Sequence, residues 1–291
     1  MAQTLPGAWG AATDPGRKRR MNEDSYLAST PVFMVADGMG GHDRGDLASA
    51  IAVDEFSALC QYTEVVPELI DACFRRASTR IKETLREGVG GTTVCGVALA
   101  LQDGAPYWLV FNIGDSRAYR YNSVRGSMAQ ISVDHSVIQE LMDAGVVAPQ
   151  DAAQHAERHV ITRALETVTD PEPDYWMIPV EGGDQILLCS DGLTDELTDS
   201  DILDIWMNSD SPQATALALV HSALEAGGRD NITTVVVTSD VVGYAANTAA
   251  QRTAPLLAIP ELEPDLDPVQ DLAVSADARA TEPTRPRNVR S

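Results

Sequence analysis

Short apolar runs bounded by Gly, Asp, Asn or Pro recur along this chain and predict β-strands. They are rich in Val, Ile, Leu and aromatic residues, and several follow one another through short turns, which favours antiparallel pairing. The predicted strands run from Trp9 to Thr13, Pro31 to Ala36, Thr92 to Leu101, Tyr107 to Ile113, Ser116 to Tyr121, Tyr175 to Val180, Gln185 to Cys189 and Ile232 to Thr238.

Helical segments separate these strands in two places. Early in the chain the pattern predicts helices from about Gly45 to Tyr62 and from about Val65 to Arg86, the second with one apolar face of period 3.6. A late pair is predicted near Ser200 to Met207 and Pro212 to Ala226, and a short helix near Ser136 to Ala144. This order predicts an α+β fold, with helices on both outer faces of two packed antiparallel sheets.

The composition changes near Val242, where Pro, Ala, Glu, Asp and Thr become dominant and the apolar period is lost. We therefore expect one folded domain over residues 1–240 and a disordered tail over residues 241–291. The tail is either a carrier of a docking motif or a passive extension.

The chain has a formal net charge of −22, which argues against nucleic-acid partners and against binding to an anionic membrane. This charge is either a solvated acidic surface or, in part, a concentrated carboxylate site for divalent cations. The four scattered cysteines lie in apolar runs, without CxxC spacing, and no signal peptide or membrane span is recognisable. We therefore expect a cytoplasmic protein.

Carboxylates stand where predicted strands begin or end. Asp37, Asp115 and Asp191 each follow an apolar run, and Asp230 comes directly before the last strand. Because the start of one strand lies beside the ends of its antiparallel neighbours, these four aspartates are expected to converge on one rim of the sheets. Packed carboxylates repel one another, and hard cations such as Mg²⁺, Ca²⁺ or Mn²⁺ remove that cost.

Other kinds of site find less support in the sequence. Of the five histidines, only His155 and His159 have HxxxH spacing, and no cysteine or third histidine stands near them in the sequence, so zinc is not favoured. No GxSxG elbow, P-loop, or GxGxxG with a matching acidic residue is present, and no DxDxDG calcium loop.

Seven motifs together resemble the PP2C-type, metal-dependent serine/threonine phosphatases in their bacterial branch. They occur in the family order and cover roughly Ala8 to Thr238. The motifs are Arg19-Arg20-Met21-Asn22-Glu23-Asp24, Ala36-Asp37-Gly38-Met39-Gly40-Gly41-His42, Gly91-Thr92-Thr93, Asn112-Ile113-Gly114-Asp115-Ser116-Arg117-Ala118-Tyr119, Asp134-His135-Ser136, Ser190-Asp191-Gly192-Leu193-Thr194-Asp195 and Gly228-Arg229-Asp230-Asn231.

The resemblance implies a four-layer αββα sandwich, in which two antiparallel sheets are flanked by helix pairs. It implies hydrolysis of phosphoserine and phosphothreonine in proteins by a water that two Mn²⁺ or Mg²⁺ ions activate, with a third ion at a weaker site. The implied partners are phosphorylated proteins, including a serine/threonine kinase, and we expect a monomer.

Roles for individual residues follow from the resemblance. Asp37 resembles the carboxylate that bridges the two catalytic metals, and the Gly38 carbonyl would bind one of them. Asp191 and Asp230 would bind the other, and Asp115 with Asp191 the third. Glu23 would hold metal-bound water, with Asp24 in the same network, and Asn231 is expected beside the ligands without binding metal itself.

A substrate-binding cation and a proton donor complete the expected site. Arg19 has the spacing from Glu23 of the family arginine that grips the substrate phosphate, although the neighbouring basic residues leave a shift by one residue open. The position after Asp37-Gly38, which is His in many eukaryotic members, is Met39 here. We expect a metal-bound water to protonate the leaving group, and His42, three residues on, is a second candidate acid.

The segment from Asp134 to about Arg163 corresponds to the mobile flap of bacterial relatives and either sets substrate choice or is a structural excursion. Two other functions stay open at this point. One is a phosphatase dedicated to one phosphorylated regulator, and the other is a non-catalytic phosphoprotein-binding relative.

Overall fold

The computed structural model describes residues 6–40, 44–85, 90–152, 155–166 and 170–239. The chain divides into a compact unit over residues 1–256 and a second unit over residues 257–291. Every described residue belongs to the first unit, so the layers below are those of that unit. The predicted tail, 241–291, and His42 lie outside the described residues.

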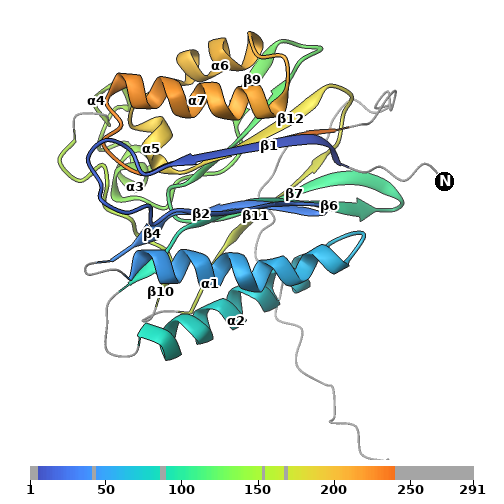
Figure 1. The fold of residues 1–291 in the computed structure, drawn as a ribbon, viewed down its shortest axis with the longest axis horizontal. Helices are drawn as coiled ribbons and strands as arrows, with labels where there is room; N and C mark the ends of the chain where they lie inside the picture. Colours follow the sequence, from blue (N-terminus) through green and yellow to red (C-terminus); the bar gives the residue numbers. More distant parts are fainter. Residues whose placement is uncertain (1–5, 41–43, 86–89, 153–154, 167–169, 240–291) are drawn as a thin grey trace, which may run out of the picture. The chain divides into compact units, whose positions relative to one another are not determined.

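Two five-stranded antiparallel sheets form the centre of this unit (Figure 1). In one sheet the strand order is β1 (Pro6–Asp14), β13 (Ile232–Ser239), β12 (Asp184–Cys189), β8 (Arg117–Asn122) and β9 (Ser127–Gln130). In the other it is β11 (Asp174–Pro179), β7 (Ala105–Ile113), β6 (Val94–Gln102), β3 (Val32–Ala36) and β2 (Ser25–Ser29). A small third sheet joins β10 (Leu165–Glu166), β5 (Gly91–Thr92) and β4 (Gly38–Met39).

Helices cover the outer face of each large sheet. Helix α1 (Gly45–Ser57), followed by a short 3₁₀ turn η1 (Ala58–Gln61), and α2 (Pro67–Leu85) pack on the sheet that contains β3, β6 and β7. Helices α6 (Asp199–Met207) and α7 (Pro212–Ala226) pack on the other sheet. Figure 1 shows these four layers in the order helices, sheet, sheet, helices, as predicted.

Three buried apolar clusters fill the spaces between the layers. The middle cluster lies between the two sheets and consists mainly of alternating strand residues such as Phe33, Val97, Trp108, Ile186 and Val235. Its members follow the period of two that places every second side chain on one sheet face. Burying these chains is the main term that stabilises the sandwich.

Three short helices connect the strands near the ends of the sheets. They are α3 (Val137–Asp143), α4 (Pro149–Ala152) and α5 (Asp191–Thr194). In the described part of the chain, no helix combines the length and the apolar character needed to cross a membrane.

The predicted elements are present, with two local corrections. The strand predicted from Thr92 to Leu101 is interrupted at Thr93, because the Thr93 N–H donates to the Asp37 carbonyl (2.9 Å) across the start of the sheet. The strands β2, β4, β9 and β10 and the short helices α4 and α5 were not predicted. Strand β9 is mostly exposed, so it carries no apolar alternation for a sequence pattern to detect.

Candidate active site

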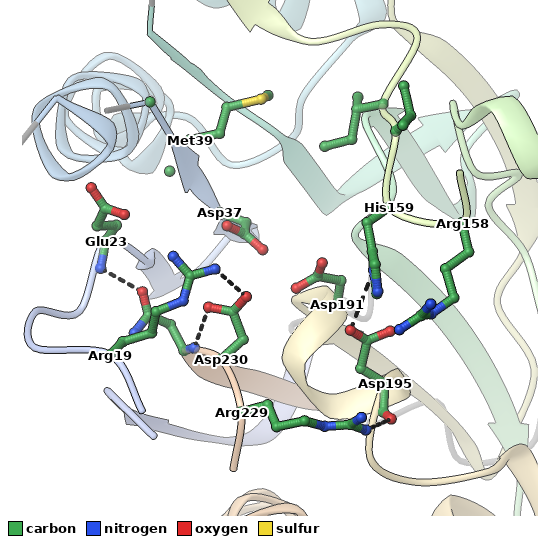
Figure 2. A pocket seen from close by; sticks show the side chains of 15 residues that line it. Arg19, Glu23, Asp37, Met39, Arg158, His159, Asp191, Asp195, Arg229 and Asp230 are labelled. Carbon is green, nitrogen blue, oxygen red and sulfur yellow. Dashed lines mark hydrogen bonds and ion pairs between the residues drawn. The ribbon is translucent and has the colours of Figure 1, made fainter. Parts of the chain in front are cut away.

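Asp37 is held at the end of a fully buried strand, β3. Its backbone N–H donates to the Thr93 hydroxyl (3.0 Å), and its carbonyl accepts from the Thr93 N–H and the Thr92 hydroxyl, both at 2.9 Å. With the backbone fixed on both sides, the side chain points into a cavity (Figure 2). The Thr93 hydroxyl also bonds the Ser116 hydroxyl (2.7 Å), which links Asp37 to the turn that carries Asp115.

Gly38 follows Asp37 and lines the same cavity. A Cβ at this position would lie 2.2 Å from the Gly45 carbonyl oxygen and 2.5 Å from the Glu23 carbonyl oxygen. Because both obstacles are backbone atoms, only glycine fits between them. This packing brings the start of α1 and the Glu23 segment against the strand that carries Asp37.

Asp191 and Asp230 come from neighbouring strands of the other large sheet. Asp191 opens helix α5 directly after β12, and Asp230 precedes β13. Figure 2 shows the carboxylates of Asp37, Asp191 and Asp230 facing a common space, and all three residues line one cavity of about 760 Å³. The convergence expected from the strand-end pattern is therefore present for these three residues.

Asn231 joins Asp230 to the loop between β1 and β2. Its buried side-chain amide donates to the carbonyls of Pro15 (2.9 Å) and Met21 (2.8 Å), and its oxygen accepts from the Glu23 N–H (2.9 Å). Its backbone N–H donates to the Asp230 carboxylate (2.8 Å). One side chain thus fixes the loop that carries Arg19 and Glu23 relative to Asp230.

Arg19 and Glu23 also line this cavity. The Arg19 guanidinium donates to the Asp230 carboxylate at 2.6 Å, and half of its side chain is exposed. Burial raises the pKa of Glu23, against the opposing effect of the nearby Arg19. Arg19 is thus one of three arginines, with Arg158 and Arg229, that line this carboxylate-rich cavity.

The carboxylates of the site disfavour one another's ionised forms. Burial, reinforced by the surrounding aspartates, raises the pKa of Asp37 and of Asp191 well above the ordinary value. Burial likewise raises the pKa of Asp24 to about 6 and that of Asp115 to about 7. Such a cluster is unfavourable at neutral pH unless cations neutralise it.

Asp24 has one oxygen satisfied and one without a partner. Its Oδ2 accepts from the Ser190 hydroxyl (2.8 Å), whereas its buried Oδ1 has no hydrogen-bond partner. Together with the clustered carboxylates, an unpartnered buried oxygen fits a site completed by hard cations and their waters. Asp37, Asp191 and Asp230 offer oxygen donors, which suit Mn²⁺ or Mg²⁺.

Asp115 lies in an adjoining cavity of about 560 Å³ rather than in the cavity of Asp37. Asp191, Asp195, Arg158 and His159 line both cavities, so the two are neighbours. The Gly114–Asp115 turn is fixed by His135, whose Nδ1 accepts from the Gly114 N–H (3.1 Å). Since that nitrogen is an acceptor, the Nε2 of His135 carries the proton and donates to Asp174 (3.0 Å).

The comparisons with known proteins agree on one family. A sequence model of protein phosphatase 2C matches residues 17–226. The chain belongs to the protein phosphatase 2C family. It is 36% identical over 265 residues to the serine/threonine protein phosphatase PstP of Mycobacterium tuberculosis, covering 88% of this chain and 48% of PstP. The chain thus spans about half the length of that relative.

One further relative and one solved catalytic domain match over most of their own length. The serine/threonine phosphatase stp of Listeria welshimeri is 32% identical over 77% of this chain and 93% of its own. A crystal structure of the catalytic domain of PstP in complex with two manganese ions superposes with a TM-score of 0.71. It is 32% identical and covers 81% of this chain and 98% of its own. The resemblance stated from the motifs is confirmed, as is the four-layer fold.

This protein phosphatase 2C member brings further residues to the site that the sequence did not single out. Asp195, one helical turn after Asp191, lies 3.5 Å from His159, and one ligand atom from each of these three residues lies within 4.8 Å of the others. Asp195 belongs to the motif Ser190-Asp191-Gly192-Leu193-Thr194-Asp195. Its spacing of one helical turn from Asp191 could have indicated that the two carboxylates lie close together. Arg158 carried no signal, and His159 carried only its HxxxH spacing from His155, because the folded segment 155–161 is what brings both residues to the cavity.

Proposed function

We propose that this chain is a metal-dependent protein serine/threonine phosphatase, which hydrolyses phosphoserine and phosphothreonine in proteins. The observation that carries the proposal is the single cavity lined by Asp37, Asp191, Asp230 and Arg19. It combines a carboxylate set suited to divalent cations with a half-exposed guanidinium suited to a phosphate. The names of the relatives and the manganese-bound PstP structure support the same function.

The cations proposed for this site are Mn²⁺ or Mg²⁺. Asp37, the Gly38 carbonyl, Asp191 and Asp230 would hold two of them, with Glu23 binding through water, and Asp115 with Asp191 would hold a third. When bound, such cations supply a water of lowered pKa and positive charge for the phosphoryl oxygens. Asp24 and Asn231 keep the ligands in place through the contacts described above.

The chain's own residues bind and orient the phosphate. Arg19 is proposed to grip the phosphoryl oxygens through its Nη groups, since planar guanidinium donors match phosphate geometry. Met39 lines the cavity but has no proton to give to the leaving alkoxide. A metal-bound water is our proposed donor of that proton, and His42 stays a second candidate.

The segment 134–163 is proposed to act as a flap that influences substrate choice. Arg158, His159, Val160 and Ile161 from this segment line the cavity opposite Arg19 and Glu23. Both ends of the segment are held together, because the Thr162 N–H donates to the His135 carbonyl (2.9 Å).

We further propose that residues 1–240 form one folded domain, followed by a tail, and that the protein is a monomer. A serine/threonine kinase is proposed among its substrates.

The cysteines bear on the compartment in which the protein is proposed to act. The structure contains free thiols at Cys60, Cys73, Cys95 and Cys189, three of them buried. Such thiols suit a reducing compartment, which supports a cytoplasmic protein.

Hydrolysis by the purified chain tests the proposal. Para-nitrophenyl phosphate and a phosphothreonine peptide would be assayed with Mn²⁺, with Mg²⁺ and with chelator, for the wild type and for Asp191→Asn. We expect metal to restore and chelator to abolish activity on both substrates, and the variant to be inactive. A folded wild type that is inactive with every metal would contradict the proposal and leave phosphoprotein binding as the function.

A further inference from the structure

A run of four cations stands out in this acidic chain. Arg17, Lys18, Arg19 and Arg20 follow one another in the loop between β1 and β2, and all four are exposed. The chain as a whole has a net charge of −22. Most of its surface therefore repels an acidic partner, whereas this loop attracts one.

Three of these cations are free to bind a partner. Arg19 is paired with Asp230, but no ion pair or side-chain hydrogen bond involves Arg17, Lys18 or Arg20 within the described residues. Most other described cations are already neutralised by a carboxylate. The paired ones are Arg76, Arg80, Lys82, Arg117, Arg120, Arg125, Arg163 and Arg229.

The loop is fixed beside the cavity. The Arg17 N–H donates to the Gly228 carbonyl (2.7 Å), and a Cβ on Gly228 would lie 3.2 Å from the Arg17 Cγ. Asn231 holds the same loop at both ends through the carbonyls of Pro15 and Met21. Arg19 lines the cavity (Figure 2), and the three free cations stand within two residues of it in this fixed loop.

We propose that Arg17, Lys18 and Arg20 form a docking surface for anionic groups that flank the phosphorylated residue of a protein substrate. The inference rests on the proposed phosphatase function and adds a substrate class to it. Each cation stands within two residues of Arg19, and an extended substrate advances about 3.3 Å per residue. The surface therefore binds a carboxylate or a second phosphate that lies within about three residues of the phosphate bound by Arg19.

Two matched phosphothreonine peptides test this inference. They are identical except that the residues on both sides of the phosphothreonine are aspartates in one and alanines in the other. The kcat/KM values would be compared at low salt for the wild type, for Lys18→Gln/Arg20→Gln, and for Lys18→Glu/Arg20→Glu. Arg75→Gln is the matched control, because Arg75 is exposed on α2 and does not line the cavity.

The wild type and the Arg75→Gln control should prefer the acidic peptide by about tenfold, since each exposed charge pair is worth roughly a two- to fivefold change. The neutral double variant should hydrolyse the two peptides with nearly equal kcat/KM, and the charge-reversed variant should prefer the alanine peptide. High salt should reduce the wild-type preference toward unity. Using a ratio of two substrates cancels any general loss of activity in a variant.

Two results would overturn the inference and they are distinguishable. If the enzyme hydrolyses both peptides but the ratio is unity in the wild type, or unchanged in the double variants, the docking surface is wrong and the phosphatase function stands. If the wild type hydrolyses neither peptide with any metal, the proposed function falls and the docking surface falls with it.

Discussion

Arg19 and Asp230 form an ion pair of 2.6 Å in the lining of the carboxylate-rich cavity. The guanidinium is half exposed and the carboxylate is 29% exposed, so water screens the pair and it adds little to stability. Each of the two residues can therefore exchange this ion pair for a stronger interaction with another group. In the proposed function, a phosphate would compete for Arg19 and a divalent cation would compete for Asp230.

Replacing Arg19 tests its proposed contact with the phosphate. We expect Arg19→Ala to lower kcat/KM on a phosphothreonine peptide by about 10²-fold, because a charge-assisted contact to the phosphoryl oxygens is lost. Arg19→Lys should recover only part of this loss, since lysine cannot bind bidentately. Steady-state kinetics with Arg75→Ala as the control provide the measurement. Wild-type kinetics in Arg19→Ala would show that the phosphate is bound elsewhere.

Asp191→Asn should have opposite effects on activity and on stability. Activity should fall by at least about 100-fold through loss of a ligand and its charge. In chelator, however, the variant should melt roughly 2–5 °C above the wild type, because one of several repelling buried carboxylates is gone. Thermal melts with Asp204→Asn, an exposed carboxylate, as the control would separate this local effect from the reduced net charge. A variant that melts below the wild type in chelator would contradict the repulsion argument.

The raised pKa values predict an unusual pH dependence for the metal-free protein. The pKa of Asp24 is raised to about 6 and that of Asp115 to about 7, so the folded state binds more protons than the unfolded state between about pH 4 and pH 7. The free energy of unfolding should therefore fall as the pH rises through that window. Melting in chelator at pH 5.0 and 7.5 should show a drop on the order of 5 °C, and Mn²⁺ should stabilise more at pH 7.5.

The Asp115 turn allows a matched check of this pH effect. Asp115→Asn should reduce the drop between pH 5.0 and 7.5, since one of the groups that gains a proton on folding is removed. An equal drop in the variant and the wild type would assign the effect to other groups.

His135 is predicted to hold the Asp115 turn in place. It is buried, accepts from the Gly114 N–H and donates to Asp174, whose pKa this contact lowers to about 2. His135→Ala should cost about 3 kcal/mol of unfolding free energy, through an unpaired buried N–H and a cavity. His135→Asn should cost less, because its oxygen can replace the Nδ1 acceptor. Urea unfolding of both variants measures the difference, and equal losses would show that the Gly114 contact contributes nothing.

Much of the fold was predictable from local patterns. Strands such as β3 and β12 are short apolar runs with clear ends, and the 3.6-period face of α2 is distinct in the sequence. The exposed edge strand β9 lacks such a pattern. The break at Thr93 depends on a hydrogen bond to a strand that is distant in sequence, which no local pattern contains.

The carboxylates of the site were predictable for a topological reason. Asp37, Asp191 and Asp230 stand at strand termini, and antiparallel pairing brings such termini to one rim. Arg158 and His159 were not, because they reach the cavity from a long connection whose path depends on contacts such as that between Thr162 and His135. The position of Asp115 in a separate cavity was also not predictable. Strand ends predict that residues share one edge of the sheets, but they do not predict which cavity along that edge each residue lines.

Counting bound metal while measuring turnover tests the central claim most directly. Chelator-treated protein would be titrated with Mn²⁺ by calorimetry, and hydrolysis of a phosphothreonine peptide would be followed over the same Mn²⁺ concentrations, for the wild type and Asp37→Asn. We predict that each wild-type chain binds at least two Mn²⁺ ions and that hydrolysis appears only as they bind. In Asp37→Asn, we predict that both Mn²⁺ binding and hydrolysis are lost. Hydrolysis that proceeds before any Mn²⁺ binds, or that survives in Asp37→Asn, would contradict the account.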